Sequence, residues 1–444
     1  MASKVYYISG QALGLFSGNS LVRVRRVLGT TGIERAFVMA TMVIMLLENQ
    51  IPAIAGFSIS FLWFGVMACY VVLNRSQALS SIWSHPVFLA AYAFLGLAVF
   101  MESFHPDPRY SEIVRIGLMV AGAVFISSLC RDKAALRATI EGYLLGAIGM
   151  TVLLFLTLYG VLSGVTADSF DQASQIRSQV ASEINYANNL NGMAITAATG
   201  AVLALVLALT TKSFRLRILF LGTSAFCAIA TFLPFSRTAV VILALSSATV
   251  MFAYGVNVRA IVIALVLGAG VLIWVPEAVF PRLSFSLDRN EARADLYRAT
   301  IDHFSEYVLF GVGNGNFYGD WGLNSEFAIH GNGIIYQAHN AFVQVTLYWG
   351  LVGFFAFLMF VWQAYRCVPR RCGMDALSLC LLGIAIGGFL NLFAQPDLYA
   401  KSSSVLLGIL VGARHWIWPD GIVPSGTRAS SPHSKMITNT QIGE

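Results

Sequence analysis

Four stretches of the chain place polar side chains directly beside apolar runs, where they could carry chemistry at the edge of a membrane. The stretches read "NNLNGMA", "LPFSRTAVV", "SLDRNEARADLYRATIDHFSEYV" and "QAHNAFVQ". Polar groups in such positions are expensive to retain and are usually functional. The candidate residues, in chain order, are Asn189, Asn191, Ser236, Arg237, Arg289, Arg293, Tyr297, Arg298, His339 and Asn340.

The arginines could bind an anion. A guanidinium presents a fixed fork of donors that fits a phosphate group. At Arg237, the hydroxyl of Ser236 and the N-terminus of the following helix would add further donors. The alternative for Arg237 is an interfacial arginine that extends to the lipid head groups. The alternative for the other three arginines is ion pairing with carboxylates of their own segment.

His339 is the candidate general base, because the unperturbed pKa of histidine, roughly 6.5, suits proton transfer near neutral pH. The alternative is a capping or packing residue near a helix start. Asn340 could cap that helix or hold either the imidazole or a sugar hydroxyl. Asn189 and Asn191 suit sugar hydroxyls, but asparagines also form ordinary caps and turns.

Taken together, arginines, one histidine and several amides match the transfer of a glycan from a diphosphate. The arginines could neutralise the charge that develops on a departing diphosphate, and the histidine could deprotonate the attacking hydroxyl. Metal catalysis is not expected, because there is no H-E-x-x-H motif and the seven histidines are scattered. No Gly-x-Ser-x-Gly elbow is present, and no cofactor is expected.

Composition indicates an all-α integral membrane protein that positions these residues. Of the 444 residues, 57% are hydrophobic and 11% are charged, whereas a soluble domain carries roughly 25% charged residues. Repeated apolar runs of about 20 residues predict membrane helices. We predict twelve, at 36–56, 57–73, 86–101, 112–130, 138–160, 188–211, 216–234, 237–256, 259–275, 340–362, 376–394 and 402–418.

The distribution of basic residues predicts the orientation of the helices. With a cytoplasmic N-terminus, the outer segments keep only nine of the 28 Lys and Arg residues, as the positive-inside rule expects. Both termini should therefore be cytoplasmic, and the net charge of +6 reflects topology and does not indicate nucleic-acid binding. The nine outer residues are Arg109, Arg115, Arg177, Arg237, Arg282, Arg289, Arg293, Arg298 and Lys401.

The chain divides into a cytoplasmic segment (1–35), helices one to nine (36–275), a long outer loop (276–338), helices ten to twelve (339–418) and a polar tail (419–444). Residues 1–35 lack the pattern of a cleavable signal peptide, and the tail composition predicts disorder. A loop as long as 276–338 is usually functional. The glycines of its "FGVGNGNFYGDWG" stretch could belong to a nucleotide-binding loop or to a tight turn. We predict the tight turn, because the spacing does not follow the G-x-G-x-x-G nucleotide pattern.

The same stretches resemble, in the same order, motifs of the bacterial O-antigen ligase and Wzy-type polymerase superfamily. The similarity includes "NNLNGMA", "FSRTAVV", the loop helix with the following Gly-x-Gly turn, and "AHNAFVQVTLYWGLVG". It implies a GT-C-type fold with a partly helical periplasmic loop between helices nine and ten. It also implies that Arg237 and Arg293 bind the diphosphate of an undecaprenyl-linked glycan, with His339 as the base. Tyr297 departs from the family, which often has Trp there.

The resemblance leaves two reactions open. A polymerase transfers a growing glycan onto the next lipid-linked repeat unit, and a ligase transfers the finished glycan onto lipid A-core. We favour a metal-independent, inverting polymerase for an exopolysaccharide or O-antigen, in the bacterial inner membrane with its active face in the periplasm. The implied protein partners are a flippase and a chain-length regulator. From another class, a transporter or lipid-linked glycan flippase is the alternative, although no halves of the chain repeat, as they do in many transporters.

Overall fold

The computed structural model describes residues 32–47, 59–162, 190–234, 236–263, 266, 291–325, 327–329, 334–335, 340–369, 375–394 and 401–418. Apart from one short antiparallel hairpin, β1 (Ala328–Ile329) and β2 (Ile334–Ile335), the regular structure of these residues is helical. The prediction of an all-α membrane protein therefore agrees with the structure.

Eleven of the twelve predicted spans overlap a long helix, and the ninth lies mostly outside the described residues. The overlapping helices are α2 (Gly32–Leu47), α3 (Ile59–Trp83), α4 (Pro86–Glu102), α5 (Ser111–Leu129), α6 (Lys133–Leu162), α8 (Leu190–Thr210), α9 (Phe214–Phe232), α10 (Arg237–Tyr254), α16 (Ala341–Tyr365), α17 (Ala376–Ala394) and α18 (Lys401–Trp416).

Not all of these helices qualify as membrane spans. In the described part of the chain, seven are long and apolar enough to cross a bilayer, namely α5, α6, α8, α9, α10, α16 and α17. The helices α3 and α4 meet at a bend of 77° and add an eighth span if the pair counts as one. The prediction of twelve spans is therefore not confirmed, and α2 and α18, at 16 residues each, are shorter than the ~20 residues that span a bilayer.

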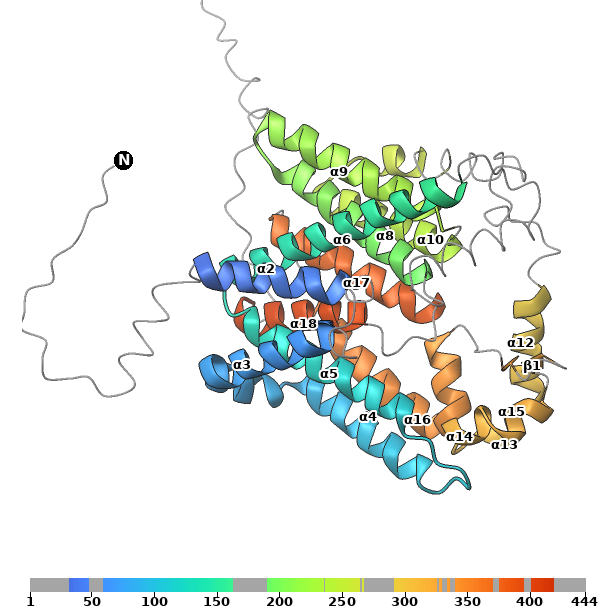
Figure 1. Cartoon of the computed structure of the whole chain (residues 1–444). Coiled ribbons are helices and arrows are strands. Elements are labelled where there is room, and N and C mark those ends of the chain that lie inside the picture. Colours follow the sequence, from blue (N-terminus) through green and yellow to red (C-terminus); the bar gives the residue numbers. More distant parts are fainter. Residues whose placement is uncertain are drawn as a thin grey trace, which may run out of the picture.

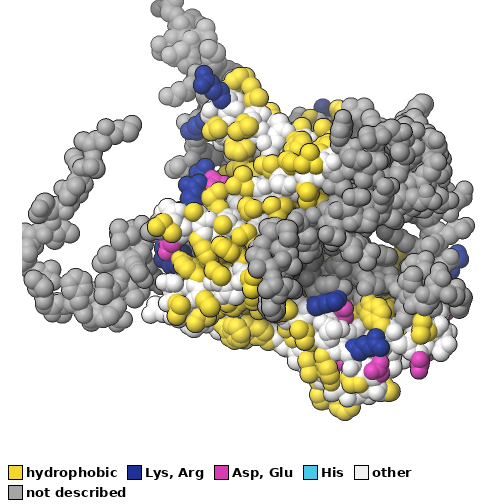
Figure 2. Space-filling model, in the orientation of Figure 1, with side chains coloured by type: hydrophobic (Ala, Val, Ile, Leu, Met, Phe, Trp, Pro, Cys, Tyr) yellow, Lys and Arg dark blue, Asp and Glu magenta, His cyan; other side chains and the backbone are white. Residues whose placement is uncertain are grey.

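Four short helices belong to the loop between α10 and α16. They are α12 (Glu291–Asp302), α13 (Phe304–Tyr307), α14 (Asn314–Phe317) and α15 (Asp320–Asn324). Figure 1 shows them gathered at one end of the helix bundle, which we call the loop end. In Figure 2, hydrophobic side chains cover the middle of the visible face, while charged side chains gather towards its two ends.

Glycine residues on helix surfaces allow the helices to pack closely. Gly142 and Gly146 of α6 lie against Met39 and Leu46 of α2, so closely that a Cβ atom would approach within 2.8 Å. Gly408 and Gly412 of α18 lie similarly against α5. Both pairs have the Gly-x-x-x-Gly spacing that lets helices approach in membranes.

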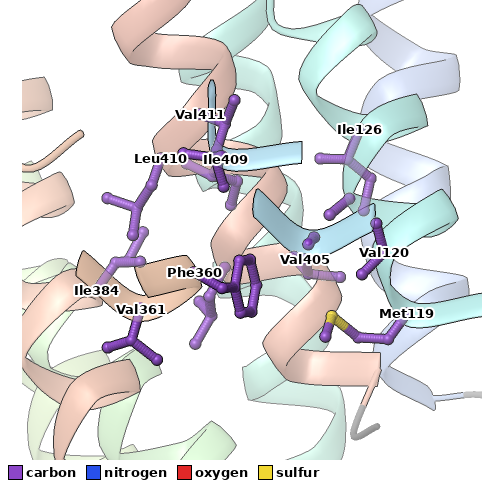
Figure 3. Close-up of a cluster of buried hydrophobic side chains, with 14 of the residues drawn as sticks. Met119, Val120, Ile126, Phe360, Val361, Ile384, Val405, Ile409, Leu410 and Val411 are labelled. Atoms are coloured by element: carbon purple, nitrogen blue, oxygen red, sulfur yellow. The ribbon is translucent and has the colours of Figure 1, made fainter. Parts of the chain in front are cut away.

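Apolar side chains of α5, α16, α17 and α18 meet in the interior of the bundle. Figure 3 shows part of this cluster, with Val120 and Ile126 from α5, Phe360 from α16 and Val405 from α18. All four side chains are buried. This cluster holds α16, the helix that follows the loop, against the centre of the bundle.

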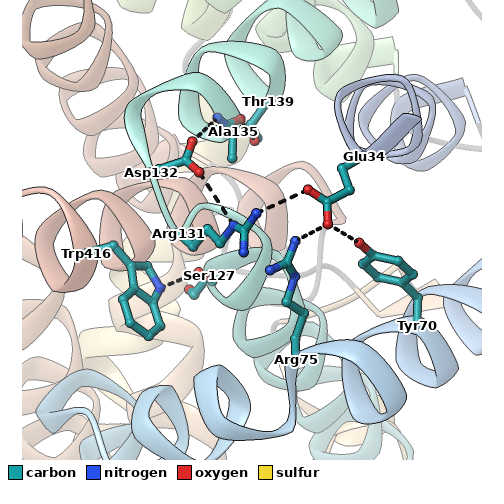
Figure 4. A network of polar contacts seen from close by, with 9 residues as sticks. All are labelled: Glu34, Tyr70, Arg75, Ser127, Arg131, Asp132, Ala135, Thr139 and Trp416. Carbon is teal, nitrogen blue, oxygen red and sulfur yellow. Dashed lines mark hydrogen bonds and ion pairs between the residues drawn. The ribbon is translucent and has the colours of Figure 1, made fainter. Parts of the chain in front are cut away.

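A charge network joins the helices at the end opposite the loop end (Figure 4). The carboxylate of Glu34 in α2 accepts from Arg75 at 2.7 Å and from Arg131 at 3.2 Å. Arg75 stands at a kink inside α3, and Arg131 also contacts Asp132, which caps α6 through the backbone N–H of Ala135. The network fixes the junction of α2, α3, α5 and α6.

The helix α16 is interrupted at Trp349 and Gly350, and the loop supplies hydrogen-bond partners for the backbone groups at the interruption. Gly350 has φ 62° and ψ −164°, a conformation that only glycine adopts readily. The backbone N–H groups of Val312 and Gly313 donate to the carbonyls of Leu347 and Tyr348 at 2.9 and 3.0 Å. Directly after the break, the backbone N–H groups of Leu351 and Val352 donate to the carbonyls of Val308 and Leu309.

This pairing explains two motifs that lie far apart in the sequence. The predicted tight turn is present, with Gly311 at φ 77°. A Cβ atom on Gly311 would lie 2.2 Å from the carbonyl oxygen of Tyr348, and one on Gly350 would lie 2.2 Å from the carbonyl group of Leu309. Irregular backbone inside a membrane helix is tolerated only where protein or water satisfies its polar groups. Here the loop supplies these partners.

A buried glutamate, Glu102 at the end of α4, fastens the turn to the bundle. Its carboxylate is fully buried and accepts four hydrogen bonds. The backbone N–H groups of Arg109 and Gly315 donate to Oε1 at 2.9 and 3.1 Å. The backbone N–H of Asn314 and the indole N–H of Trp349 donate to Oε2 at 2.9 and 3.2 Å. One side chain thus joins α4, the α4–α5 loop, α14 and the break in α16.

Replacing Glu102 by Gln should detach the turn from the bundle, although the two side chains have nearly the same shape. Each carboxylate oxygen accepts hydrogen bonds from two N–H groups. The NH2 group of glutamine cannot accept hydrogen bonds, so in either position it would leave two N–H groups without an acceptor. We expect a loss of about 2 kcal/mol of stability, the cost of buried unsatisfied donors. Thermal unfolding in detergent and hydrogen–deuterium exchange over residues 308–318 would measure it.

The control is Asp107→Asn, which removes a carboxylate that is 59% exposed in the same region. It should leave both readouts near those of the wild type. Equal exchange over 308–318 in Glu102→Gln and wild-type protein would contradict the proposed attachment.

Replacing Gly350 by Ala should destabilise the protein by about 2 kcal/mol or more, because alanine cannot adopt the observed backbone conformation without strain. The added Cβ would also collide with the carbonyl group of Leu309. Gly388→Ala in α17 is the control, since no atom lies within 4 Å of its Cβ position. The midpoint of thermal unfolding should fall for Gly350→Ala and not for Gly388→Ala, and equal midpoints would show that the break does not require glycine.

Candidate active site

Ser236 and Arg237 form the N-terminus of α10. Ser236 is buried at 3% exposure, and its hydroxyl oxygen accepts from the backbone N–H of Ala239 at 3.4 Å. The capping bond explains why the helix begins at Arg237. Arg237 is the first helical residue and is half-buried. Arg237 thus lies at the N-terminus of α10, the positive end of the helix dipole, where anions are favoured.

Asn340 caps α16. Its side-chain oxygen accepts from the backbone N–H groups of Phe342 and Val343 at 2.9 and 3.2 Å. Of the roles considered for Asn340, the capping role is thus present in the structure. Because the oxygen already has two donors, only the side-chain NH2 group remains to contact a substrate.

The packing of α17 brings three helix starts to the same end of the bundle. Leu390 packs against a cluster that includes Ala194 of α8 and Ala239 of α10. The rings of Phe393 in α17 and Phe342 in α16 have centroids 4.9 Å apart. Consequently Asn191, in the first turn of α8, lies at the same end as Arg237 and Asn340.

The loop helix α12 carries Tyr297 and Arg298. Both side chains are exposed, Tyr297 at 40%, so they are accessible to a ligand at the loop end. The predicted loop helix extends from Glu291 but stops at Asp302, where His303 separates α12 from α13. Figure 1 shows α12 standing beside the bundle at the loop end.

The structure does not place the side chains of four predicted site residues, and the predicted substrate and base roles of all ten remain untested. His339, Asn189 and Arg289 lie outside the described residues, and of Arg293 only the backbone, within α12, is described. The predicted diphosphate and base roles of these residues therefore stay predictions.

Sequence reasoning missed Glu102 and Asn391. Glu102 was placed just past the end of a predicted span, although a carboxylate at the end of an apolar run is itself a signal of a buried polar contact. Asn391 lies near the end of α17, is 9% exposed and has a side-chain oxygen with no hydrogen-bond partner among the described residues. An asparagine within a predicted span carries the same signal.

An apolar cavity of about 760 Å³ lies apart from these polar groups, between α16, α17 and α18. Its lining includes Phe360, Val361, Ile384 and Leu410 (Figure 3). Such a lining suits hydrocarbon and offers little to a sugar or a diphosphate. Within the described residues, no group of three or more His, Cys, Asp and Glu side chains could hold a metal ion.

Comparison with known families gives an independent indication. A family model described as O-antigen ligase matches residues 218–358, a segment that runs from α9 to the middle of α16. It contains the candidate residues from Ser236 to Asn340 and leaves Glu102 and Asn391 outside. No curated protein matches the chain significantly. Residues 218–358 are thus similar to an O-antigen ligase domain, which supports the resemblance of the chain to the O-antigen ligase and Wzy-type polymerase superfamily.

Proposed function

We propose that the protein transfers a glycan from an undecaprenyl-diphosphate donor to a sugar hydroxyl at the periplasmic face of the bacterial inner membrane. The observation that carries the proposal is the position of Arg237. It is half-buried at a capped helix N-terminus, within the segment that matches the O-antigen ligase family. A cation and a helix dipole in one place favour a diphosphate over a neutral group.

In this mechanism the arginines stabilise the departing diphosphate. Arg237 and Arg293 bind its oxygens, with Arg298 and Arg289 adding positive charge nearby. As the bond between the anomeric carbon and the phosphate oxygen breaks, negative charge grows on the diphosphate, and fixed cations lower the barrier. The hydroxyl of Ser236 donates a hydrogen bond to the diphosphate, because in the cap its oxygen only accepts a bond from Ala239.

His339 removes the proton from the attacking hydroxyl, which bonds to the anomeric carbon as the diphosphate leaves. A single displacement of this kind inverts the configuration of the anomeric carbon. The NH2 group of Asn340, together with Asn189, Asn191 and Tyr297, contacts sugar hydroxyls. The protein residues supply all the required groups, so the mechanism uses no metal or cofactor.

Of the two reactions in the superfamily, we propose polymerisation, in which the acceptor is a second lipid-linked repeat unit. Ligation to lipid A-core is the alternative, and the description of the matching family as O-antigen ligase favours testing it in parallel. Both use the same donor and the same acid–base chemistry, so the acceptor alone distinguishes them. In the cell, a flippase would supply the donor and a chain-length regulator would limit the product.

Purified protein in proteoliposomes should convert undecaprenyl-diphosphate repeat units into a ladder of longer glycans without another acceptor. A product that forms only when lipid A-core is added would identify a ligase. Neither product, together with uptake of the lipid-linked glycan across the vesicle membrane, would instead support a transporter or flippase. Gel separation of radiolabelled glycan distinguishes the first two outcomes, and the amount of label protected inside the vesicles reports the third.

Arg237→Lys should reduce transfer by about tenfold or more, because lysine keeps the charge but loses the two-pronged donor geometry. The matched control is Arg215→Lys, which makes the same exchange on the exposed side of α9 near the opposite end of the bundle. Initial rates at saturating acceptor and varied donor would locate the effect. Wild-type donor affinity and rate in Arg237→Lys would reassign this arginine to the membrane interface.

His339→Gln should lower the maximal rate by about a hundredfold or more, in the range attributed to general-base catalysis, and leave donor binding unchanged. Near-normal turnover by a stably folded variant would rule out the base role. The pH dependence of the rate supplies a second check, since loss of the base should remove the wild-type dependence on a group that titrates near neutral pH.

A further inference from the structure

Three side chains of the loop form a polar and aromatic cluster that the proposed mechanism does not use. The carboxylate of Glu306 accepts from the indole N–H of Trp321 at 2.7 Å. Its other oxygen lies 2.7 Å from Nδ1 of His303. The rings of His303 and Trp321 meet edge to face, with centroids 5.7 Å apart. We call these three residues the loop triad.

The loop triad joins two elements of the loop, α13 with its N-cap residue and α15. His303 is the residue between α12 and α13, and Glu306, three residues later, lies on the same side of the turn. Trp321 belongs to α15. Its ring is supported by Phe317 and Phe327, with centroids 6.3 and 5.9 Å away, and both supporting rings are fully buried. The cluster therefore does not depend on a ligand for its shape.

The loop triad also keeps unused binding capacity on its exposed side. The side chains of Glu306 and His303 are 47% and 26% exposed, and Trp321 is half-buried. Each carboxylate oxygen has a further lone pair, and the imidazole has a second nitrogen. Hydrogen bonds from His303 and then Trp321 lower the pKa of Glu306, so the carboxylate is ionised at neutral pH.

These properties fit a sugar better than they fit other ligands. Carbohydrate hydroxyls donate hydrogen bonds to an ionised carboxylate, and such bonds are stronger than bonds between neutral groups. A half-exposed aromatic ring offers an apolar face for the C–H groups of a sugar ring, and binding sites commonly combine such surfaces with a few fixed polar groups. An anionic ligand such as a diphosphate would be repelled by Glu306.

We propose that His303, Glu306 and Trp321 form a binding site for hydroxyls of the acceptor glycan, separate from the residues expected to bind the diphosphate. The proposal rests on the proposed function in one respect, namely that the glycan it binds is the acceptor of transfer. Glu306 accepts hydrogen bonds from two hydroxyls, His303 contacts a third group through Nε2, and Trp321 supports the sugar ring.

Glu306→Gln tests the site with little disturbance of the loop. The Gln oxygen can still accept from the Trp321 indole, and its NH2 group can donate to Nδ1 of His303, so both contacts to α15 and His303 survive. What is lost is the negative charge and one accepting oxygen. His303→Gln is the second variant, since its amide can still donate to Glu306. Asp320→Asn is the control, because it removes an exposed carboxylate next to Trp321.

The measurement is direct binding of an oligosaccharide released by mild acid from the producing cell's surface polysaccharide. Fluorescence anisotropy of the labelled oligosaccharide, with the full chain in nanodiscs, reports the dissociation constant without any transfer reaction. Glu306→Gln should bind about tenfold more weakly, as expected for one hydrogen bond to a charged group. His303→Gln should also weaken binding, and Asp320→Asn should match the wild type.

Two outcomes would overturn the proposal: equal binding by wild-type and Glu306→Gln protein, or no binding of the oligosaccharide by the wild type. The transfer assay separates this result from the proposed function. Transfer with unchanged binding in Glu306→Gln rejects the loop site alone. Oligosaccharide binding that depends on Glu306, without transfer from the diphosphate donor, supports the site and rejects the transferase.

Discussion

The burial of one carboxylate, that of Glu102, determines how the loop rests on the helix bundle. A carboxylate in an apolar interior is tolerated only when donors surround it, and the donors here come from the α4–α5 loop, from α14 and from Trp349 in α16. Removing any of these elements would leave the buried carboxylate with fewer donors than its charge requires. The loop, the bundle and the broken helix must therefore fold together, and the helix starts that carry Arg237 and Asn340 are held at the end where the loop sits.

The helices could largely be predicted from the sequence, because long apolar runs have few alternatives in a bilayer. The number of spans is not confirmed, since hydropathy averaged over a window does not register a kink such as that at Arg75 or the sharp bend between α3 and α4. The tight glycine turn was predictable from local backbone preferences. Its partner was not, because Gly350 is far along the chain and only the folded protein brings the two together.

The candidate site shows the same division between local and long-range causes. Ser236 and Asn340 stand at helix starts because their side chains cap the following residues, and such short-range bonds leave a sequence signature. The pairing of His303 with Glu306 is also short-range, but the addition of Trp321 depends on the fold of the loop. In the sequence, Glu102 and Asn391 are noticeable only as polar residues in apolar surroundings. Such a position indicates a buried polar contact, but the sequence does not show which residue provides it.

The attachment at Glu102 also bears on how such a protein can diversify. The segment 218–358 that defines the family similarity is not mechanically self-contained, since its turn is secured to a residue of α4 and to the loop after it. A loop with a different acceptor preference could not be transplanted alone into this bundle. A chimera that exchanges the loop would have to carry the end of α4 and the α4–α5 loop with it, because these two distant parts of the sequence share one set of buried hydrogen bonds.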